Sequence, residues 1–312
     1  MGGVKAGARR ALRWGERRQQ KVEDLAAATE VDISGVQTVC LFLGPYRNLT
    51  TMTAAVLFLH PNCQVLNHAR DRIFGDKRLD FLARYDDDTF DNFVRFAIRI
   101  SGSGKGGVEG GSITKSHAFG EEYNTRAAFE ASALDLVKPE VKALVWKESM
   151  ATSNHIRDHK VDLDAVFDQN QRLRFLMPVR HPLDSAVSNI KTRNTRFLAG
   201  VNHHSSPARV ADAILDEVAW FRSLQTRHPD RFFSFYEHDD GQATLVRMAE
   251  FLEIDPCDEW LANAGETFDP KKRYSEHPAE LVAHYERSVA ERFDDQPDVK
   301  DALLRFVPPS TA

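Results

Sequence analysis

The chain has 312 residues, of which 42% are hydrophobic and 28% are charged, a composition typical of globular proteins that argues against wholesale disorder. Its longest apolar runs, 39–43 and 54–59, are far shorter than the ~18 residues of a membrane-spanning helix, and the start lacks the apolar core of a secretory signal. Three widely spaced cysteines without a CxxC motif predict reduced thiols rather than a disulfide or zinc framework. We therefore expect a cytoplasmic protein.

Positive charge is concentrated at the start of the chain. The net charge is −5, yet residues 1–21 hold seven basic side chains and one acid. The remaining chain carries 34 basic and 45 acidic side chains, which makes it a poor candidate for nucleic-acid binding. We predict that residues 1–35 form a basic, helical N-terminal extension, which is either solvated or in peripheral contact with an anionic membrane surface.

The first predicted elements after this extension form a βαβ unit. Residues 36–43 are a β-branched and apolar run that predicts a buried strand, and Gly44-Pro45 ends it. Helical character follows at 50–59, and 63–66 predict a second short strand. A strand–helix–strand order of this kind predicts a parallel sheet.

The rest of the chain continues the alternation of strands and helices. A glycine-rich stretch at 101–114 predicts a flexible loop. Further strands are predicted at 141–146, 172–179 and 232–236. Further helices are predicted at 78–100, 121–137, 183–192, 208–227, 243–252 and 278–293. The pattern predicts one α/β domain over residues 36–312, with three α/β/α layers and a central, mainly parallel sheet.

The turn after the first strand is the first segment whose residues could bind a ligand. It reads GPYRNLTT over residues 44–51 and leads into a helix. Such a turn presents free backbone N–H groups and the positive end of the helix dipole, where phosphate or sulfate binds well. Arg47 adds a full charge, and Thr50 and Thr51 add hydroxyl donors. The alternative for this segment alone is a plain Thr-Thr helix cap.

A second candidate segment follows the strand at 172–179. Arg180 comes directly after the strand, and Ser188 lies eight residues later in the next helix. Ligands of doubly wound sheets gather at the carboxyl ends of the strands, and an arginine there with a helical serine suits a second phosphate. The alternative is a structural ion pair between Arg180 and Asp184.

Together these segments resemble the sulfotransferase family that uses 3′-phosphoadenosine 5′-phosphosulfate (PAPS). Residues 47–51 lie where the family has its 5′-phosphosulfate loop, and Arg180 with Ser188 is similar to its 3′-phosphate motif, including an Arg-x-Pro-x-Asp core. The resemblance covers about residues 38–68 and 142–255. It implies a P-loop-like fold and sulfonate transfer from PAPS to a hydroxyl or amine of a small-molecule, carbohydrate or lipid acceptor, without a metal.

The resemblance also implies which residues bind the nucleotide. They are Arg47, Asn48, Leu49, Thr50, Thr51, Arg180, Ser188, Lys271, Lys272 and Arg273. Leu49 stands where the family has glycine, and Asn48 stands where it has serine. Glycine there lets the backbone approach a phosphate or adopt positive φ, so either this loop takes a different path or donor binding is weakened.

Sulfonate transfer requires a cation at the leaving oxygen and a base at the acceptor. Arg47 lies at the position of the family's catalytic cation and would stabilise the leaving group. His68 follows the second strand, and imidazole, with an unperturbed pKa of about 6.5, suits a base near neutral pH. Glu148 is the alternative base, and Lys147 matches a strand-end lysine that contacts the sulfonate in similar proteins. The alternative for His68 is a purely structural hydrogen bond. The alternative for Lys147 and Glu148 is a local ion network.

Other classes of function are less well supported. The glycine-rich residues 102–107 lack the Gly-x4-Gly-Lys-Ser/Thr pattern of a Walker loop, which disfavours a nucleotide kinase. A phosphotransferase that uses the same anion loop, or a non-catalytic nucleotide- or partner-binding protein, is the alternative function. His155 and His159 lie four residues apart without the glutamate of a zincin motif, so we predict a solvated helix face and no metal.

Overall fold

Six strands form one sheet in the computed structural model, which describes residues 15, 18–104, 109–268 and 275–307. They are β1 (Thr38–Phe42), β2 (Cys63–Asn67), β3 (Gly111–Ser112), β4 (Ala143–Lys147), β5 (Leu173–Val179) and β6 (Phe232–Tyr236). Their order across the sheet is β3-β2-β4-β1-β5-β6. All neighbours are parallel except β3, which runs antiparallel to β2. The strand order reverses at β1, so the loop after β1 lies at the point where ligands of such sheets bind.

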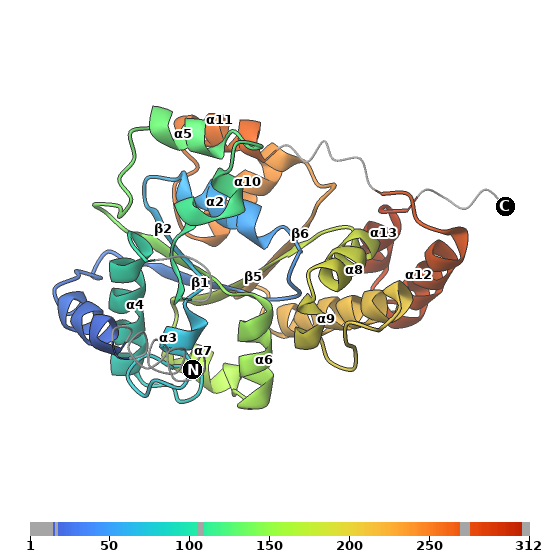
Figure 1. The fold of residues 1–312 in the computed structure, drawn as a ribbon, viewed down its shortest axis with the longest axis horizontal. Coiled ribbons are helices and arrows are strands. Elements are labelled where there is room, and N and C mark those ends of the chain that lie inside the picture. The colour runs from blue at the N-terminus through green and yellow to red at the C-terminus, as the bar shows by residue number, and fades with distance from the viewer. Residues whose placement is uncertain (1–14, 16–17, 105–108, 269–274, 308–312) are drawn as a thin grey trace, which may run out of the picture.

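Helices cover both faces of this sheet (Figure 1). One face carries α2 (Thr50–Phe58), α5 (Thr125–Ala131), α10 (Gly241–Phe251) and α11 (Asp258–Thr267). The other face carries α4 (Asp87–Ser101), α6 (Met150–Asp158), α7 (Leu163–Gln169) and α9 (Pro207–Arg227), with α3 (Arg70–Ile73) beside them. Next to α9 lie α8 (Pro182–Lys191), α12 (Ala279–Arg292) and α13 (Pro297–Leu304). The predicted three-layer α/β/α architecture is confirmed.

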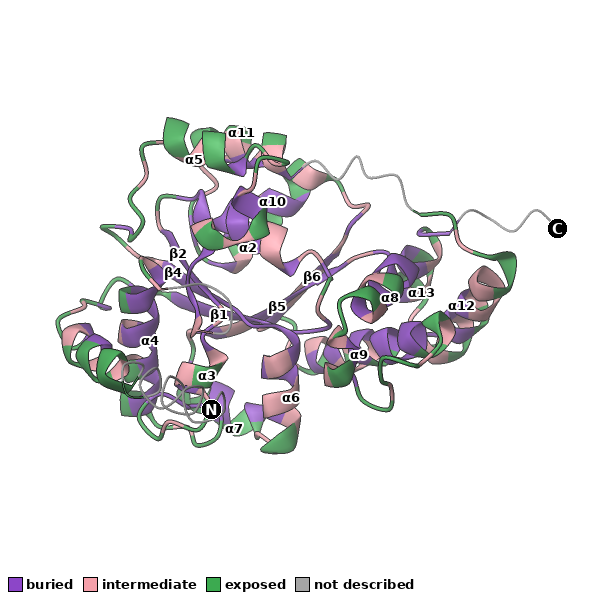
Figure 2. Ribbon diagram, in the orientation of Figure 1, coloured by how far each residue is buried: buried purple, intermediate pink, exposed green. Residues whose placement is uncertain are grey.

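The sheet separates two hydrophobic cores. Val39 and Leu41 of β1 belong to the core under α4, α6 and α9, whereas Cys40 and Phe42 belong to the core under α2 and α10. This alternation follows from the two-residue period of a strand, which sends successive side chains to opposite faces. All five residues of β1 are buried, and Figure 2 shows the strands as the buried layer between the helices.

The glycine-rich stretch differs from the predicted loop. Ser101 is the last residue of α4, and Gly111 and Ser112 form β3 beside the end of β2. A Cβ on Gly110, which has φ +74, would lie 2.3 Å from the Cβ of Ala69, so only glycine permits this close approach. Ser101, Gly111 and Ser112 thus belong to a helix and a strand, whereas residues 102–104 lie outside both. Residues 105–108 lie outside the described part of the chain, and the flexibility of the loop stays a prediction.

The structure describes the predicted N-terminal extension only in part. Residues 18–28 are helical, and Lys21 forms an ion pair of 2.7 Å with Asp76, whereas residues 1–14, 16 and 17 lie outside the described chain. The division at residue 35 stays a prediction.

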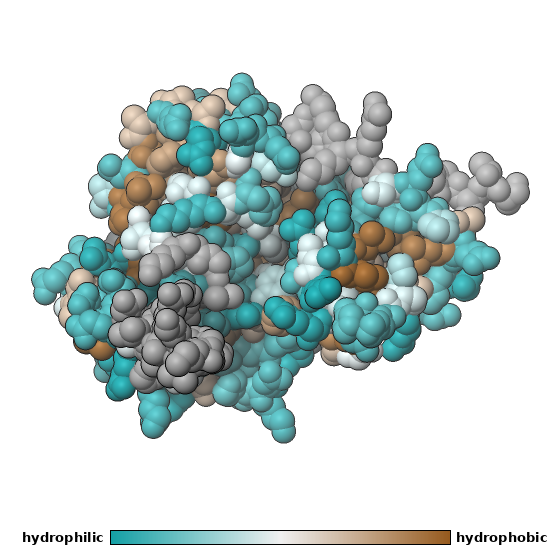
Figure 3. Space-filling model, in the orientation of Figure 1, coloured by the Kyte–Doolittle hydropathy of each residue, from teal (hydrophilic) through white to brown (hydrophobic). Residues whose placement is uncertain are grey.

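No helix among the described residues has both the length and the apolar character needed to cross a membrane. Hydrophilic side chains cover most of the face shown in Figure 3.

Candidate functional site

The candidate residues that the structure describes gather at the carboxyl edge of the sheet. Arg47 follows β1, His68 follows β2, Lys147 ends β4 and Arg180 follows β5. These four strands are neighbours in the order β2-β4-β1-β5, and they run parallel. Their carboxyl ends therefore meet at one edge, which brings together side chains that are up to 133 positions apart in the sequence.

The loop between β1 and α2 has an unusual backbone. Gly44, Arg47 and Leu49 have φ values of +86°, +64° and +60°. Leu49 thus adopts the left-handed conformation that favours glycine, at a cost of about 1–2 kcal/mol for a residue with a Cβ. The carbonyl of Leu49 accepts bonds from the Thr53 N–H (3.0 Å) and hydroxyl (3.1 Å), which holds it in place. Leucine here retains the glycine-like backbone conformation.

The N-terminus of α2 carries the two predicted hydroxyl donors, Thr50 and Thr51. Leu49 is the N-cap residue of α2, and no side chain caps the helix. Thr50 and Thr51 form the first turn of the helix instead, so the alternative of a plain Thr-Thr cap is wrong. The first N–H groups of a helix have no partner within it, and they favour an anion.

Two direct contacts join the two predicted anion-binding segments. The Arg47 Nε donates to the Ser188 Oγ at 2.9 Å, and the Arg180 N–H donates to the Asn48 Oδ1 at 2.8 Å. The Asn48 amide also donates to the Pro178 carbonyl. Asn48, which stands where the resemblance places serine, is buried and connects the loop after β1 to the end of β5. The two segments are therefore in direct contact.

Arg180 has a different acidic neighbour from the one considered in the sequence. Its Nε lies 3.7 Å from Oε1 of Glu237, which follows β6 and is buried. Asp184 instead pairs with His277 at 2.9 Å and accepts from the Ser275 N–H at 3.4 Å. The alternative of an Arg180–Asp184 ion pair is thus wrong among the described residues. The Arg180 side chain is 23% exposed, so solvent reaches it.

His68, Lys147 and Glu148 form one cluster at the ends of β2 and β4. The His68 backbone is left-handed (φ +62°), and its N–H donates to the Lys147 carbonyl at 3.1 Å. The imidazole Nε2 lies 3.2 Å from the Lys147 Nζ, and Nδ1 lies 3.4 Å from the Glu148 Oε2. Burial lowers the pKa of Lys147 to about 8, Glu148 opposes this shift and Arg47 adds to it.

Two further side chains, Tyr46 and Arg70, belong to this cluster, and Tyr46 was not among the predicted site residues. The Tyr46 hydroxyl donates to the Glu148 Oε1 at 3.2 Å, and the Arg70 Nη1 donates to the same hydroxyl at 3.2 Å. Burial, reinforced by the Glu148 charge, raises the pKa of Tyr46. The sequence signal for Tyr46 was its place inside the GPYRNLTT segment, between the proline and the cation.

The remaining candidates are a basic cluster and a pair of histidines. Lys271, Lys272 and Arg273 lie outside the described residues. The prediction of a solvated face at His155 is wrong, because the His155 Nε2 lies 2.8 Å from the Asp80 Oδ1 and its ring stacks on Phe74. No group of three or more His, Cys, Asp or Glu side chains that could hold a metal ion occurs within the part of the chain that the structure describes.

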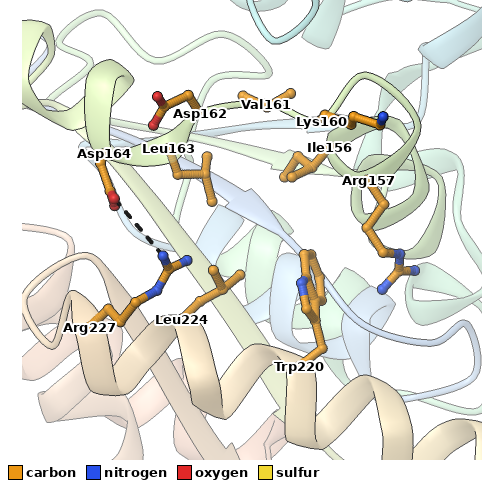
Figure 4. A pocket seen from close by; sticks show the side chains of 10 residues that line it. All are labelled: Ile156, Arg157, Lys160, Val161, Asp162, Leu163, Asp164, Trp220, Leu224 and Arg227. Atoms are coloured by element: carbon orange, nitrogen blue, oxygen red, sulfur yellow. Dashed lines mark ion pairs between the residues drawn. The ribbon is translucent and has the colours of Figure 1, made fainter.

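A pocket of about 230 Å³ lies apart from these residues, between the α6–α7 turn and the end of α9 (Figure 4). Trp220 and Leu224 of α9 line one side, and Ile156, Val161 and Leu163 line the other. It adjoins the amino edge of the sheet, because α7 leads into β5 and α9 leads into β6 there. No candidate residue lines it.

Comparisons with known proteins give similarity only at the level of structure. No protein-family model and no curated protein sequence matches the chain. Similar solved structures include mouse sulfotransferase SULT7A1 complexed with PAP, at 12% identity and a TM-score of 0.44 over 91% of this chain and 92% of that one. Sulfotransferase STF9 from Mycobacterium avium matches at 15% identity and 0.43, over 89% and 80%. A sulfotransferase from Alicyclobacillus acidocaldarius matches at 10% and 0.42, over 83% and 95%.

These solved structures are sulfotransferases, the family that the sequence motifs resemble. The strand order and the helical layers of the chain itself define its fold.

Proposed function

We propose that the chain is a PAPS-dependent sulfotransferase. The observation that carries the proposal is the direct contact between the two anion-binding segments, Arg47 with Ser188 and Asn48 with Arg180. PAPS carries an anionic group at each of two positions of one adenosine, so its recognition requires two adjacent anion sites. The parallel strand ends at the switch point of the sheet supply such a pair.

Each group of residues has a proposed part in binding PAPS. The start of α2, with Thr50 and Thr51, receives the 5′-phosphosulfate. Arg180 and Ser188 bind the 3′-phosphate, through a charge-assisted hydrogen bond and a hydroxyl. A contribution from Lys271, Lys272 and Arg273 stays a prediction. Nothing in this set requires a metal ion.

The transfer step uses the cluster beside this site. The acceptor oxygen forms a bond to sulfur as its proton passes to His68, and the bond between sulfur and the phosphate oxygen breaks. The electron pair of that bond leaves with 3′,5′-adenosine bisphosphate. Arg47 and Lys147 stabilise the charge on the leaving oxygen and on the sulfonate. The acceptor is a hydroxyl or amine of a small molecule, carbohydrate or lipid.

Calorimetric titration with 3′,5′-adenosine bisphosphate tests the proposal. We expect the full chain to bind it, and Arg180→Ala to weaken binding about 10- to 150-fold, or about 1.5–3 kcal/mol, because a charge-assisted contact is lost. Arg287→Ala, which removes an exposed arginine on α12, is the matched control and should bind like the wild type.

The same titration separates the alternatives. Binding of ATP with magnesium but not of the bisphosphate would replace the proposal with a phosphotransferase. Bisphosphate binding without sulfonate transfer to a panel of alcohols, sugars and amines would indicate a non-catalytic nucleotide-binding protein. A cytoplasmic location and a membrane contact of the basic extension stay predictions, which flotation of the full chain and of residues 22–312 with anionic vesicles would test.

A further inference from the structure

We infer that Glu148 acts on the transfer step through His68, as a carboxylate that Tyr46 and Arg70 hold in place and that fixes which imidazole nitrogen faces the acceptor. This inference rests on the proposed function, and it makes Glu148 and Tyr46 positioning residues. Glu148 is then not the base. Three neighbouring groups carry this inference, namely the Glu148 carboxylate, the His68 imidazole and the Lys147 ammonium.

The first group, the Glu148 carboxylate, has a fixed position. Its side chain is 2% exposed, and Oε1 accepts from the Tyr46 hydroxyl at 3.2 Å. The Arg70 Nη1 donates to that hydroxyl at 3.2 Å and lies 4.0 Å from Oε1. Phe197 supports both partners, because its ring lies 5.1 Å from the Tyr46 ring and 5.0 Å from the Arg70 guanidinium carbon. One carboxylate oxygen is therefore held by the Tyr46 hydroxyl.

The second group, the His68 imidazole, lies near the other carboxylate oxygen. Glu148 Oε2 is buried and accepts no hydrogen bond from the described residues, and the His68 Nδ1 lies 3.4 Å away. A buried anionic oxygen without a donor is costly, so a proton on Nδ1 is favoured over a lone pair there. The separation is long for a hydrogen bond, as is common in catalytic sites before the substrate is bound. The carboxylate thus selects the tautomer with hydrogen on Nδ1.

The third group, the Lys147 ammonium, lies at the opposite imidazole nitrogen. With hydrogen on Nδ1, the lone pair lies on Nε2, and the Lys147 ammonium donates to it at 3.2 Å. Lys147 is 5% exposed, and an incoming sulfonate gives its ammonium a stronger acceptor. Nε2 is then open to the acceptor hydroxyl. The imidazolium that forms faces the Glu148 carboxylate on one side and the Lys147 amine on the other.

Nitrogen NMR of the full chain, with ¹⁵N-labelled histidine, tests the inference without an acceptor. The His68 signals are assigned by their loss in His68→Gln, and the spectra are recorded at alkaline pH. We expect the wild-type imidazole to carry its hydrogen on Nδ1 and Glu148→Gln to shift the population toward Nε2. Hydrogen on Nε2 in the wild type, or an unchanged population in Glu148→Gln, would overturn the inference. The wild-type result decides even where the variant does not fold.

A second measurement tests whether the contact between Glu148 and His68 affects the reaction rate. Sulfate release from labelled PAPS, with water as acceptor, should fall at least tenfold in Glu148→Gln and about threefold or more in Tyr46→Phe, while the bisphosphate dissociation constant stays within twofold. Wild-type rates in both variants would overturn the inference. Glu130→Gln, an exposed glutamate on α5, is the matched control. Absent bisphosphate binding in the wild type would reject the proposed function, whereas the tautomer would still report on the Glu148–His68 pair.

Discussion

The two edges of the sheet both contain left-handed residues, but for different reasons. At the amino edge, Lys160 and Glu253 each come directly after the C-cap residue of a helix, where a left-handed residue commonly ends the helix. At the carboxyl edge, the left-handed residues follow strands and sit beside the candidate catalytic groups. They are Arg47, Leu49, His68, Ala69 and Ser149. Strain of this kind persists only where the surroundings impose it, and it clusters at functional sites.

The comparison predicts that changes at the carboxyl edge affect activity far more than changes at the amino edge. His68→Ala should lower turnover by about 10²-fold or more, because the base is lost, and should leave bisphosphate affinity nearly unchanged. Lys160→Ala, an exposed left-handed residue at the amino edge, should retain wild-type turnover. Steady-state rates of sulfonate transfer measure both. Full activity in His68→Ala would show that His68 is not the base. It would also show that activity does not depend on the carboxyl edge in the way we expect.

The second expected effect is on stability. Asn48→Ala should lower the free energy of unfolding by about 1–3 kcal/mol, because the Arg180 N–H loses its acceptor and the Pro178 carbonyl loses its donor. Asn62→Ala at the amino edge removes contacts to the exposed Glu140 and should cost less than about 1 kcal/mol. Urea unfolding of both variants gives the difference. Equal losses of unfolding free energy would mean that the Asn48 hydrogen bonds between the two loops stabilise the fold no more than the exposed contacts of Asn62.

A third test uses pH. Burial lowers the pKa of His181 to about 4, with Asp184 opposing the shift, and its Nδ1 accepts from the Leu183 N–H at 3.2 Å only while it is unprotonated. The unfolded chain binds a proton that the folded chain does not between pH 6.5 and about 4. Stability is therefore complete above pH 6.5 and falls as the pH drops, on the order of 2 kcal/mol by pH 5.

Urea unfolding at pH 7.5 and pH 5 measures this dependence, and His181→Gln is the matched variant. It should reduce the loss between the two pH values, because the buried imidazole is gone. An equal pH dependence in the variant would assign the effect to other groups.

The smallest expected effect concerns the strained backbone of Leu49. Leu49→Gly should raise the free energy of unfolding by about 0.5 kcal/mol, because relief of the left-handed conformation exceeds the greater flexibility of glycine in the unfolded chain. Leu49→Val should lower it, since a β-branched side chain tolerates positive φ poorly. Thermal unfolding compares the three chains, and a more stable Val variant would contradict a strained loop.

The strands and the fold class could be predicted because each buried strand is a local apolar run. The predicted strand at 232–236 matches β6, and the one at 172–179 differs from β5 by one residue. β3 was missed because Gly111 and Ser112 carry no apolar pattern, and their pairing depends on the close approach of Gly110 to Ala69. Short helices such as α7 and α13 were also missed, since one or two turns give little periodicity.

The candidate site could be predicted only as separate segments. Arg47 and Arg180 were identified from their places after strands, which is local information. The contact of Tyr46 with Glu148 spans 102 positions and arises because β4 lies beside β1, an order that no local pattern encodes. The left-handed backbone at Leu49 was likewise hidden, because leucine is a poor indicator of positive φ.

The hydrogen bond between Arg47 and Ser188 has a consequence for selectivity. The bond uses only the Nε of Arg47, so the other N–H groups of the guanidinium and the hydroxyl hydrogen of Ser188 can still donate to anions. An anionic group can therefore bind beside each loop while the contact holds the two loops together. This fixed spacing favours a ligand that carries two anionic groups at a matching distance over a ligand that carries one.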